Sequence, residues 1–187
     1  IRDRCKAANT AQHLSDVMAG TESGNRMNLE TFVQRSYMEK ILCDANRRFR
    51  DMSNGQFELK LIPVEDAGEG KNKGLDLEVL SIVTDKTRSV NTLSGGESFM
   101  AALSLALGMA DQIQAATAAI HLDVMFIDEG FGSLSDNARN EAVNILKEMA
   151  GKQRQIGIIS HVSELKDEIE NQLIVKKDDR GSHISWR

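Results

Sequence analysis

The chain of 187 residues is poor in aromatic side chains, proline and cysteine, and each shortage limits what it can be. Aromatic residues make up 4% of the sequence, so its core must be built mainly from aliphatic side chains. A single proline favours long regular elements over rigid turns. The two cysteines, Cys5 and Cys43, lie too far apart for a metal-ligand or disulfide framework, and unpaired thiols suit a reducing, cytoplasmic environment.

The sequence also lacks a long apolar run and a surplus of basic residues. No stretch of about 18 consecutive apolar residues occurs, so we predict no transmembrane helix and no membrane partner. The formal net charge of −5 gives no broad nucleic-acid footprint, and contact with DNA would need a local basic patch. Because the sequence starts at Ile1 without a charged and then apolar leader, we expect an excised part of a longer protein.

The first half of the chain predicts a long helix followed by a β-hairpin. Apolar residues recur with a period of about 3.6 over residues 27–52, which predicts a helix that Asn25 or Asn28 could cap. Residues 56–63 and 75–84 have the composition of strands, and we expect them to pair in antiparallel fashion.

The second half predicts a sheet with helices between its strands. Residues 94–118 are apolar almost all round, which is typical of a helix inside a core. Continuous apolar runs at 124–127 and 155–159 predict buried parallel strands, and an amphipathic helix is expected between them at 136–150. This alternation favours an α/β fold. A short helix at 163–170 and late strands at 173–176 and 183–186 complete the prediction.

The most informative motif is Leu-Ser-Gly-Gly-Glu at residues 93–97, directly before the apolar helix. Ser94 and Glu97 fit a capping box, in which each side chain accepts a hydrogen bond from the backbone of the other. Capping does not explain Gly95 and Gly96, which are unfavourable inside helices but let a ligand approach the backbone. Because a helix N-terminus presents free N–H groups and a positive dipole end, this turn also suits a phosphate group. Both interpretations stay open on these residues alone.

Two acids and a histidine follow the two apolar strands. Asp128 and Glu129 end the first strand, and His161 follows the second. The carboxyl ends of parallel strands share one edge of a sheet, where ligands of α/β proteins bind. There an Asp can hold Mg²⁺, a second acid can deprotonate water, and a His can bond a terminal phosphate. The alternative is a pair of solvated loop acids and a structural histidine. No Gly-x-x-x-x-Gly-Lys-Ser/Thr loop occurs, so the chain resembles half of a nucleotide site.

In this order the three segments resemble the signature, Walker B and switch-histidine motifs of ABC-type ATPases. The acidic pair continues as Gly-Phe-Gly-Ser-Leu at residues 130–134, which is similar to the bacterial SbcC proteins, the ATPase subunits of the SbcCD DNA exonuclease. Transporter-type members usually continue with Pro-Thr or Pro-Ser, and they have no room for the long helix and hairpin. Residues 45–49 and 52–59 resemble the place where the coiled coil of SbcC re-enters the head, and the resemblance spans about 20–187.

The resemblance implies an α/β fold, the C-terminal half of a P-loop NTPase head with a coiled-coil root helix. Residues 1–52 would be the end of the coiled coil and its root, and 53–187 would be the C-terminal lobe with signature, Walker B, D-loop and switch histidine. Walker A and the Q-loop would lie in an N-terminal lobe far upstream. The zinc hook of the family would lie at the apex of the coiled coil, also outside this chain.

The resemblance also assigns roles around ATP and Mg²⁺. Asp128 would support Mg²⁺, Glu129 would be the general base, and His161 would contact the γ-phosphate. Two heads would clamp two ATP molecules, with the signature of each head binding the ATP of the other. The ATP-binding residues of this chain would be Ser94, Gly95, Gly96, Glu97 and Ser133.

The implied partners are the N-terminal lobe, a second copy of the head, an SbcD-type nuclease and double-stranded DNA, in the cytoplasm. ATP binding and hydrolysis would gate access of DNA to the nuclease, and the isolated lobe should be inactive. The alternative is an SMC-type head with a structural role in chromosomes. SMC proteins usually continue the acidic pair with Val-Asp-Ala-Ala-Leu-Asp, which residues 130–135 do not match.

Two further features need a structural answer. The D-loop of the family reads Ser/Thr-Leu-Asp, but here Ser135 follows Ser133 and Leu134, so we expect this loop to work through Ser133 and the backbone. Basic residues lie around the predicted hairpin, and we interpret them as a solvated charged face rather than as contacts to DNA phosphates. They are Lys71, Lys73, Lys86 and Arg88.

Overall fold

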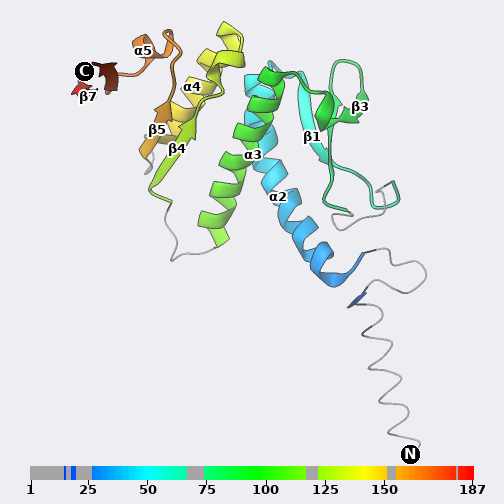
Figure 1. Cartoon of the computed structure of the whole chain (residues 1–187). Coiled ribbons are helices and arrows are strands. Elements are labelled where there is room, and N and C mark those ends of the chain that lie inside the picture. The colour runs from blue at the N-terminus through cyan, green and yellow to red at the C-terminus, as the bar shows by residue number, and fades with distance from the viewer. Residues whose placement is uncertain are drawn as a thin grey trace, which may run out of the picture. The chain divides into compact units, whose positions relative to one another are not determined.

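The computed structural model describes residues 15, 18–19, 27–66, 74–116, 122–150, 155–179 and 181–187. The chain divides into two compact units, residues 1–121 and 122–187 (Figure 1). Most of the expected coiled-coil end, up to residue 26, lies outside the described residues, as do Lys71 and Lys73.

The first unit begins with the long helix α2 (Leu29–Met52). Asn28 is the cap of this helix, since its side-chain oxygen accepts a hydrogen bond of 2.7 Å from the N–H of Thr31. The chain leaves the helix through Asn54 and Gly55, both in the left-handed region. Glycine adopts that conformation without a steric cost, which explains the sharp end of the helix here. The helix predicted at residues 27–52 is therefore confirmed.

A three-stranded antiparallel sheet follows, not the two-stranded hairpin that the sequence predicts. β1 (Phe57–Leu61) pairs with β2 (Leu77–Ser81) in antiparallel fashion, as expected. β3 (Lys86–Ser89) pairs with the other side of β2. We missed β3 because its four residues are polar and mostly exposed, so no alternation marks it. A 3₁₀ turn, η1 (Val90–Thr92), leads from β3 into helix α3 (Gly95–Ala116).

A buried amide joins the sheet to α2. The side-chain nitrogen of Asn46 donates to the carbonyl of Leu59, and its oxygen accepts from the N–H of Leu59, both at 2.8 Å. Asn46 thus bonds to β1 as a neighbouring strand would, which satisfies polar groups that burial would otherwise leave unpaired. This pair of bonds helps to fix the position of the sheet on α2.

Helices α2 and α3 lie side by side and form the core of the first unit (Figure 1). A Cβ atom at Gly108 would lie 2.8 Å from the backbone oxygen of Ile41, so the two backbones approach closely there. Arg48 and Asp111 form an ion pair of 2.6 Å between the same helices. The buried apolar residues of the pair are Leu42, Ala45, Phe49, Met52, Met100, Ala101, Leu103, Leu107 and Ala110.

Helix α3 is long and apolar enough to meet a length-and-composition criterion for crossing a membrane. A core helix meets the same criterion, and one face of α3 is buried against α2. The predicted core position is therefore correct for that face. Met109 and Ile113 lie on the other side and are 44% and 40% exposed, so the first unit by itself does not bury the helix all round as its composition suggested.

The second unit alternates strands and helices, as the sequence predicts. Its two parallel strands are in register, with Asp128 opposite Ile159. The late strands form an antiparallel hairpin. The elements in chain order are β4 (Val124–Asp128), η2 (Phe131–Ser133), α4 (Asp136–Ala150), β5 (Gln155–Ile159), α5 (Leu165–Glu168), β6 (Leu173–Asp178) and β7 (Gly181–Trp186).

The expectation that β4 and β5 are buried strands is wrong for the chain as described. Val124, Phe126 and Ile159 are 51%, 71% and 54% exposed. Parallel strands are buried only where other layers cover both faces of their sheet. Here α4 packs on β5, with Ala142, Val143 and Leu146 buried, and the sheet of the described residues has two strands. The second unit by itself therefore does not cover the apolar side chains of β4.

The close approach at Gly108 predicts an inverted response to alanine. In an open helix, Gly→Ala stabilises by up to about 1 kcal/mol. We expect Gly108→Ala to lower the free energy of unfolding by about 1–3 kcal/mol, because the new methyl group would meet the backbone of α2. Chemical denaturation followed by circular dichroism measures this. Ala106→Ser, on the exposed face of α3, is the control, and a stabilised Gly108→Ala protein would contradict the close packing.

Candidate functional site

The acidic pair and the histidine meet at one edge of the second unit, as the sequence predicts. Asp128 ends β4 opposite Ile159, and the N–H of Glu129 donates to the carbonyl of Ile159 at 2.9 Å. Because the strands are parallel, the residues after each strand leave the sheet side by side. His161 therefore stands beside Glu129, and its Nδ1 lies 2.9 and 3.1 Å from the two carboxylate oxygens.

Glu129 has an unusual backbone conformation. Its φ is +58°, in the left-handed region, and Gly130 follows at +95°. A non-glycine residue in that region carries strain of about 1–3 kcal/mol, and such strain gathers at functional sites. The Glu129 carboxylate lies against the imidazole of His161. The sequence identified Glu129 as a functional acid but did not reveal its backbone strain. The glycine that follows, Gly130, was the one sequence signal of a left-handed turn here.

Both groups are open to a ligand. The side chains of Glu129 and His161 are 50% and 81% exposed. The tautomer decides which imidazole nitrogen donates. When Nδ1–H donates to Glu129 in the neutral ring, Nε2 is an acceptor; only the imidazolium, in which both nitrogens donate, can bond to an anionic group through Nε2–H. This arrangement can orient a water molecule, accept its proton on the carboxylate, and contact an anionic group through the imidazole.

The segment after the acidic pair is held by its own turns. The hydroxyl of Ser133 donates to the carbonyl of Gly130 at 2.8 Å, and Phe131 is fully buried. Ser135 caps α4, because its hydroxyl accepts from the N–H of Ala138 at 3.4 Å. The departure that the sequence shows at residue 135 thus has a local structural role that we did not predict. Aspartate is an equally good cap, so the fold does not demand serine there.

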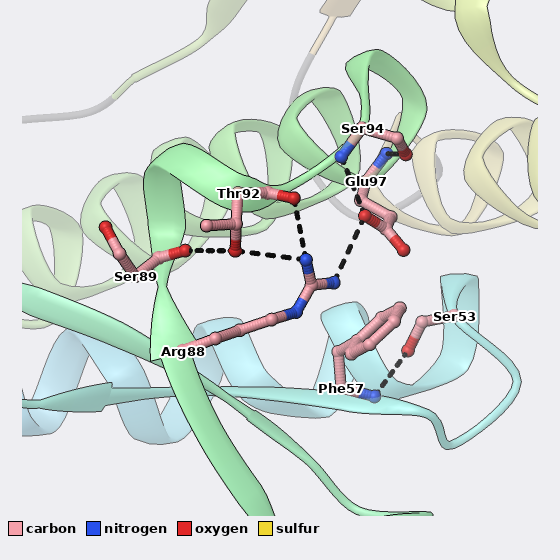
Figure 2. A network of polar contacts seen from close by, with 7 residues as sticks. All are labelled: Ser53, Phe57, Arg88, Ser89, Thr92, Ser94 and Glu97. Carbon is pink, nitrogen blue, oxygen red and sulfur yellow. Dashed lines mark hydrogen bonds and ion pairs between the residues drawn. The ribbon is translucent and has the colours of Figure 1, made fainter.

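The signature turn lies in the first unit, at the start of α3 (Figure 2). The N–H of Ser94 donates to Oε2 of Glu97 at 2.7 Å, and the N–H of Glu97 donates to the hydroxyl of Ser94 at 3.3 Å. These reciprocal bonds confirm the capping box. They leave the N–H groups of Gly95 and Gly96 in the first turn of the helix, where no intrahelical acceptor exists. Capping and anion binding are therefore compatible, and Gly95 is exposed.

The Glu97 carboxylate is held in its charged form. Burial raises the pKa of Glu97. Hydrogen bonds from the backbone and side chain of Ser94, together with the Arg88 guanidinium, lower the pKa by more than burial raises it. The net result is a pKa below the ordinary value for glutamate. The charge lies at the positive end of the α3 dipole, which adds to the stability of the turn.

The predicted site residues therefore form two groups, one in each unit. Ser94, Gly95, Gly96 and Glu97 make one turn, and Asp128, Glu129, Ser133 and His161 surround one strand edge. No three metal-binding side chains gather anywhere in the described part of the chain. A divalent cation at Asp128 would therefore take most of its ligands from groups other than the described side chains. Mg²⁺ is commonly bound by one or two carboxylates, with phosphate oxygens and water as its other ligands.

Solved structures of SMC ATPase heads share this fold. A structure described as "Structural biochemistry of ATP-driven dimerization and DNA stimulated activation of SMC ATPases" is 17% identical, with a TM-score of 0.64. It covers 84% of this chain and 89% of its own. The Smc head domain of Pyrococcus furiosus, solved with an extended coiled coil, is 19% identical with a TM-score of 0.60, over 84% of this chain and 37% of its own. The fold is that of the C-terminal half of a P-loop ATPase head with its root helix.

The sequence relatives narrow the class to one family. Residues 75–148 match the family model described as "SbcC/RAD50-like, Walker B motif". The SbcC protein of the SbcCD nuclease from Vibrio cholerae is 45% identical over 172 residues, 91% of this chain and 17% of the relative. Its counterpart from Treponema pallidum is 41% identical over 171 residues, 91% of this chain and 16% of the relative. The chain belongs to the SbcC family and spans about a sixth of the length of these relatives.

The strain at Glu129 predicts that glycine stabilises the fold there. A left-handed backbone costs a residue with a side chain about 1–2 kcal/mol. Glycine avoids this cost, but its greater freedom in the unfolded chain offsets part of the gain in stability. We expect Glu129→Gly to raise the free energy of unfolding by up to about 1 kcal/mol, as measured by denaturation. Glu129→Gln removes the charge but keeps the strain, and equal stability of the two variants would contradict the account.

The lowered pKa of Glu97 predicts a pH-dependent contribution to stability. The folded state binds the proton less readily than the unfolded state, so the stabilisation is present above the ordinary pKa of about 4.3 and is lost as the pH falls through the folded value. We expect the stability difference between wild type and Glu97→Gln to shrink between about pH 5 and pH 3. Denaturation at a series of pH values measures it, and a constant difference would refute the prediction.

Proposed function

We propose that this chain is the C-terminal lobe of the ATP-hydrolysing head of an SbcC-type protein of DNA double-strand-break repair. The head would be completed by an N-terminal lobe of the same protein and by a second head, and its ATP cycle would gate a partner nuclease. The observation that carries this proposal is the strained backbone of Glu129, which directly follows Asp128 at the carboxyl edge of β4. The side chain of Glu129 contacts His161.

The residues of the strand edge have complementary roles in this proposal. Asp128 would hold Mg²⁺, which neutralises phosphate charge when it is bound. Glu129 would orient the attacking water and accept its proton. As an imidazolium held by Glu129, His161 would donate from Nε2–H to the γ-phosphate. Ser133 would contact the ATP that is bound at the interface between the two heads.

The signature turn has its role on the other nucleotide. The N–H groups of Gly95 and Gly96 and the hydroxyl of Ser94 would bind the γ-phosphate of ATP held by the opposite head. Glu97 stabilises the turn through the capping box, so its contribution to ATP binding would be indirect. ATP would thus join two heads, and hydrolysis would release them.

The partners are supported by the relatives rather than by contacts of this chain. Relatives named as part of the nuclease SbcCD support a nuclease partner, and a structural neighbour described by ATP-driven dimerisation supports a head dimer. Double-stranded DNA and a cytoplasmic location remain parts of the proposal.

An SMC-type chromosome head is the second candidate, because the solved structures that share the fold are SMC heads. Their identity to this chain is 17% and 19%, against 45% and 41% for the SbcC relatives. The SbcC interpretation therefore accounts for more of the sequence. Co-purification of a nuclease rather than a kleisin-like protein with the full-length protein would separate the two.

The half-site proposal predicts that neither lobe hydrolyses ATP alone. We expect turnover when this chain is mixed with the N-terminal lobe of the same protein, and a loss of at least about 100-fold for Glu129→Gln, because the water loses its base. The ATP-dependent dimer should persist in that variant. A phosphate-release assay and size-exclusion chromatography measure the two effects. Turnover by the isolated chain that Glu129→Gln abolishes would overturn the half-site proposal.

A further inference from the structure

Arg88 on β3 reaches across to the signature turn, as Figure 2 shows. One guanidinium nitrogen donates to the carbonyl and the hydroxyl of Thr92 at 2.7 and 3.1 Å. The other lies 3.3 Å from Oε2 of Glu97. The solvated charged face that we predicted is therefore wrong for Arg88, whose side chain is 34% exposed and whose two terminal nitrogens both have partners.

The contacts of Arg88 converge on the atom that organises the turn. Oε2 of Glu97 accepts from both Arg88 and the N–H of Ser94. The Thr92 hydroxyl, which accepts from Arg88, donates to the carbonyl of Ser89 at 2.6 Å. One planar cation thus holds both Thr92, in the loop between β3 and α3, and Glu97, in the first turn of α3. Arginine suits this task because its fork of donors is rigid and always charged.

Aromatic side chains support the clamp, as we call the contacts of Arg88 with Thr92 and Glu97. The guanidinium lies over the ring of Phe57 on β1, 5.4 Å from its centre. Phe57 in turn stacks on Phe49 of α2, with ring centres 6.2 Å apart, and Phe49 is fully buried. A cation over an aromatic face is attracted by the ring, so Phe57 favours one position of the guanidinium. Through Phe57 and Phe49, Arg88 therefore connects the signature turn to the C-terminal end of α2.

We propose that Arg88 is a positioning residue for ATP-driven head engagement, which sets the signature turn by clamping Thr92 and Glu97 against Phe57. The proposal rests on the proposed function, because it assigns the signature turn to the nucleotide of the opposite head. Arg88 touches no nucleotide in this account. It keeps Ser94 and the N–H groups of Gly95 and Gly96 at the geometry that the phosphate needs.

The test uses the full-length protein and three variants. Arg88→Gln removes the charge and the fork, Arg88→Lys keeps the charge alone, and Lys86→Gln removes a charge from an exposed position of the same strand. We expect Arg88→Gln to weaken ATP-dependent dimerisation roughly ten-fold, with nucleotide binding by the single head unchanged and the melting temperature only slightly lowered, because the lost ion pair is partly exposed. Arg88→Lys should restore part of the loss, and Lys86→Gln should behave as wild type.

Amide hydrogen exchange without nucleotide gives a second, independent readout. Arg88→Gln should raise exchange at residues 94–97, since Ser94 loses a fixed acceptor. Unchanged exchange together with unchanged dimerisation in Arg88→Gln would overturn the positioning role. Loss of single-head nucleotide binding or of folding in that variant would also overturn it, in favour of a purely structural ion pair. Absence of ATP-dependent dimers in wild type would instead refute the proposed function, and the exchange data would still decide the clamp.

Discussion

The contact between two helix backbones at Gly108 is the constraint on which the first unit depends. With no side chain at that residue, α3 lies against α2 closely enough for the Arg48–Asp111 ion pair to form between them. The same α2 holds β1 through Asn46, so the sheet and α3 share one support. The signature turn at the start of α3 is then fixed relative to β3. A polar clamp from β3 to that turn is possible only because the helices and the sheet are already locked together.

In the second unit the parallel register of β4 and β5 has the corresponding role. It brings the residues after both strands to one edge, and the left-handed turn at Glu129 converts that closeness into a contact with His161. The buried side chain of Phe131 anchors the chain just beyond the turn, which helps to keep an unfavourable backbone in place. Val124 and Phe126 leave the apolar side chains of β4 exposed in the second unit, as in a parallel sheet without a covering layer.

Much of this architecture can be predicted from the sequence, because hydrophobic periodicity and the residues that begin and end helices are local signals. The amphipathic pattern and its flanking residues placed α4 correctly, and the order of apolar runs predicted the shared edge of Asp128, Glu129 and His161. The capping box was equally legible, because it depends on two residues three apart. The strand β3, the strain at Glu129 and the role of Arg88 were not. They depend on pairing across the sheet and on backbone angles, and polar residues in short loops carry no period that reveals either.

Mixed dimers of two damaged proteins test most directly whether each ATP site combines the Glu129 of one head with the signature of the other. Full-length Ser94→Arg and Glu129→Gln proteins should each be inactive as homodimers. A mixed dimer would pair the intact Glu129 of one head with the intact Ser94 of the other and would leave the second site doubly damaged. We predict that mixing restores ATP turnover, to about half of the wild-type rate per mixed dimer, because one of two sites is whole. No recovery, in mixtures shown to contain mixed dimers, would mean that the two groups do not act across heads.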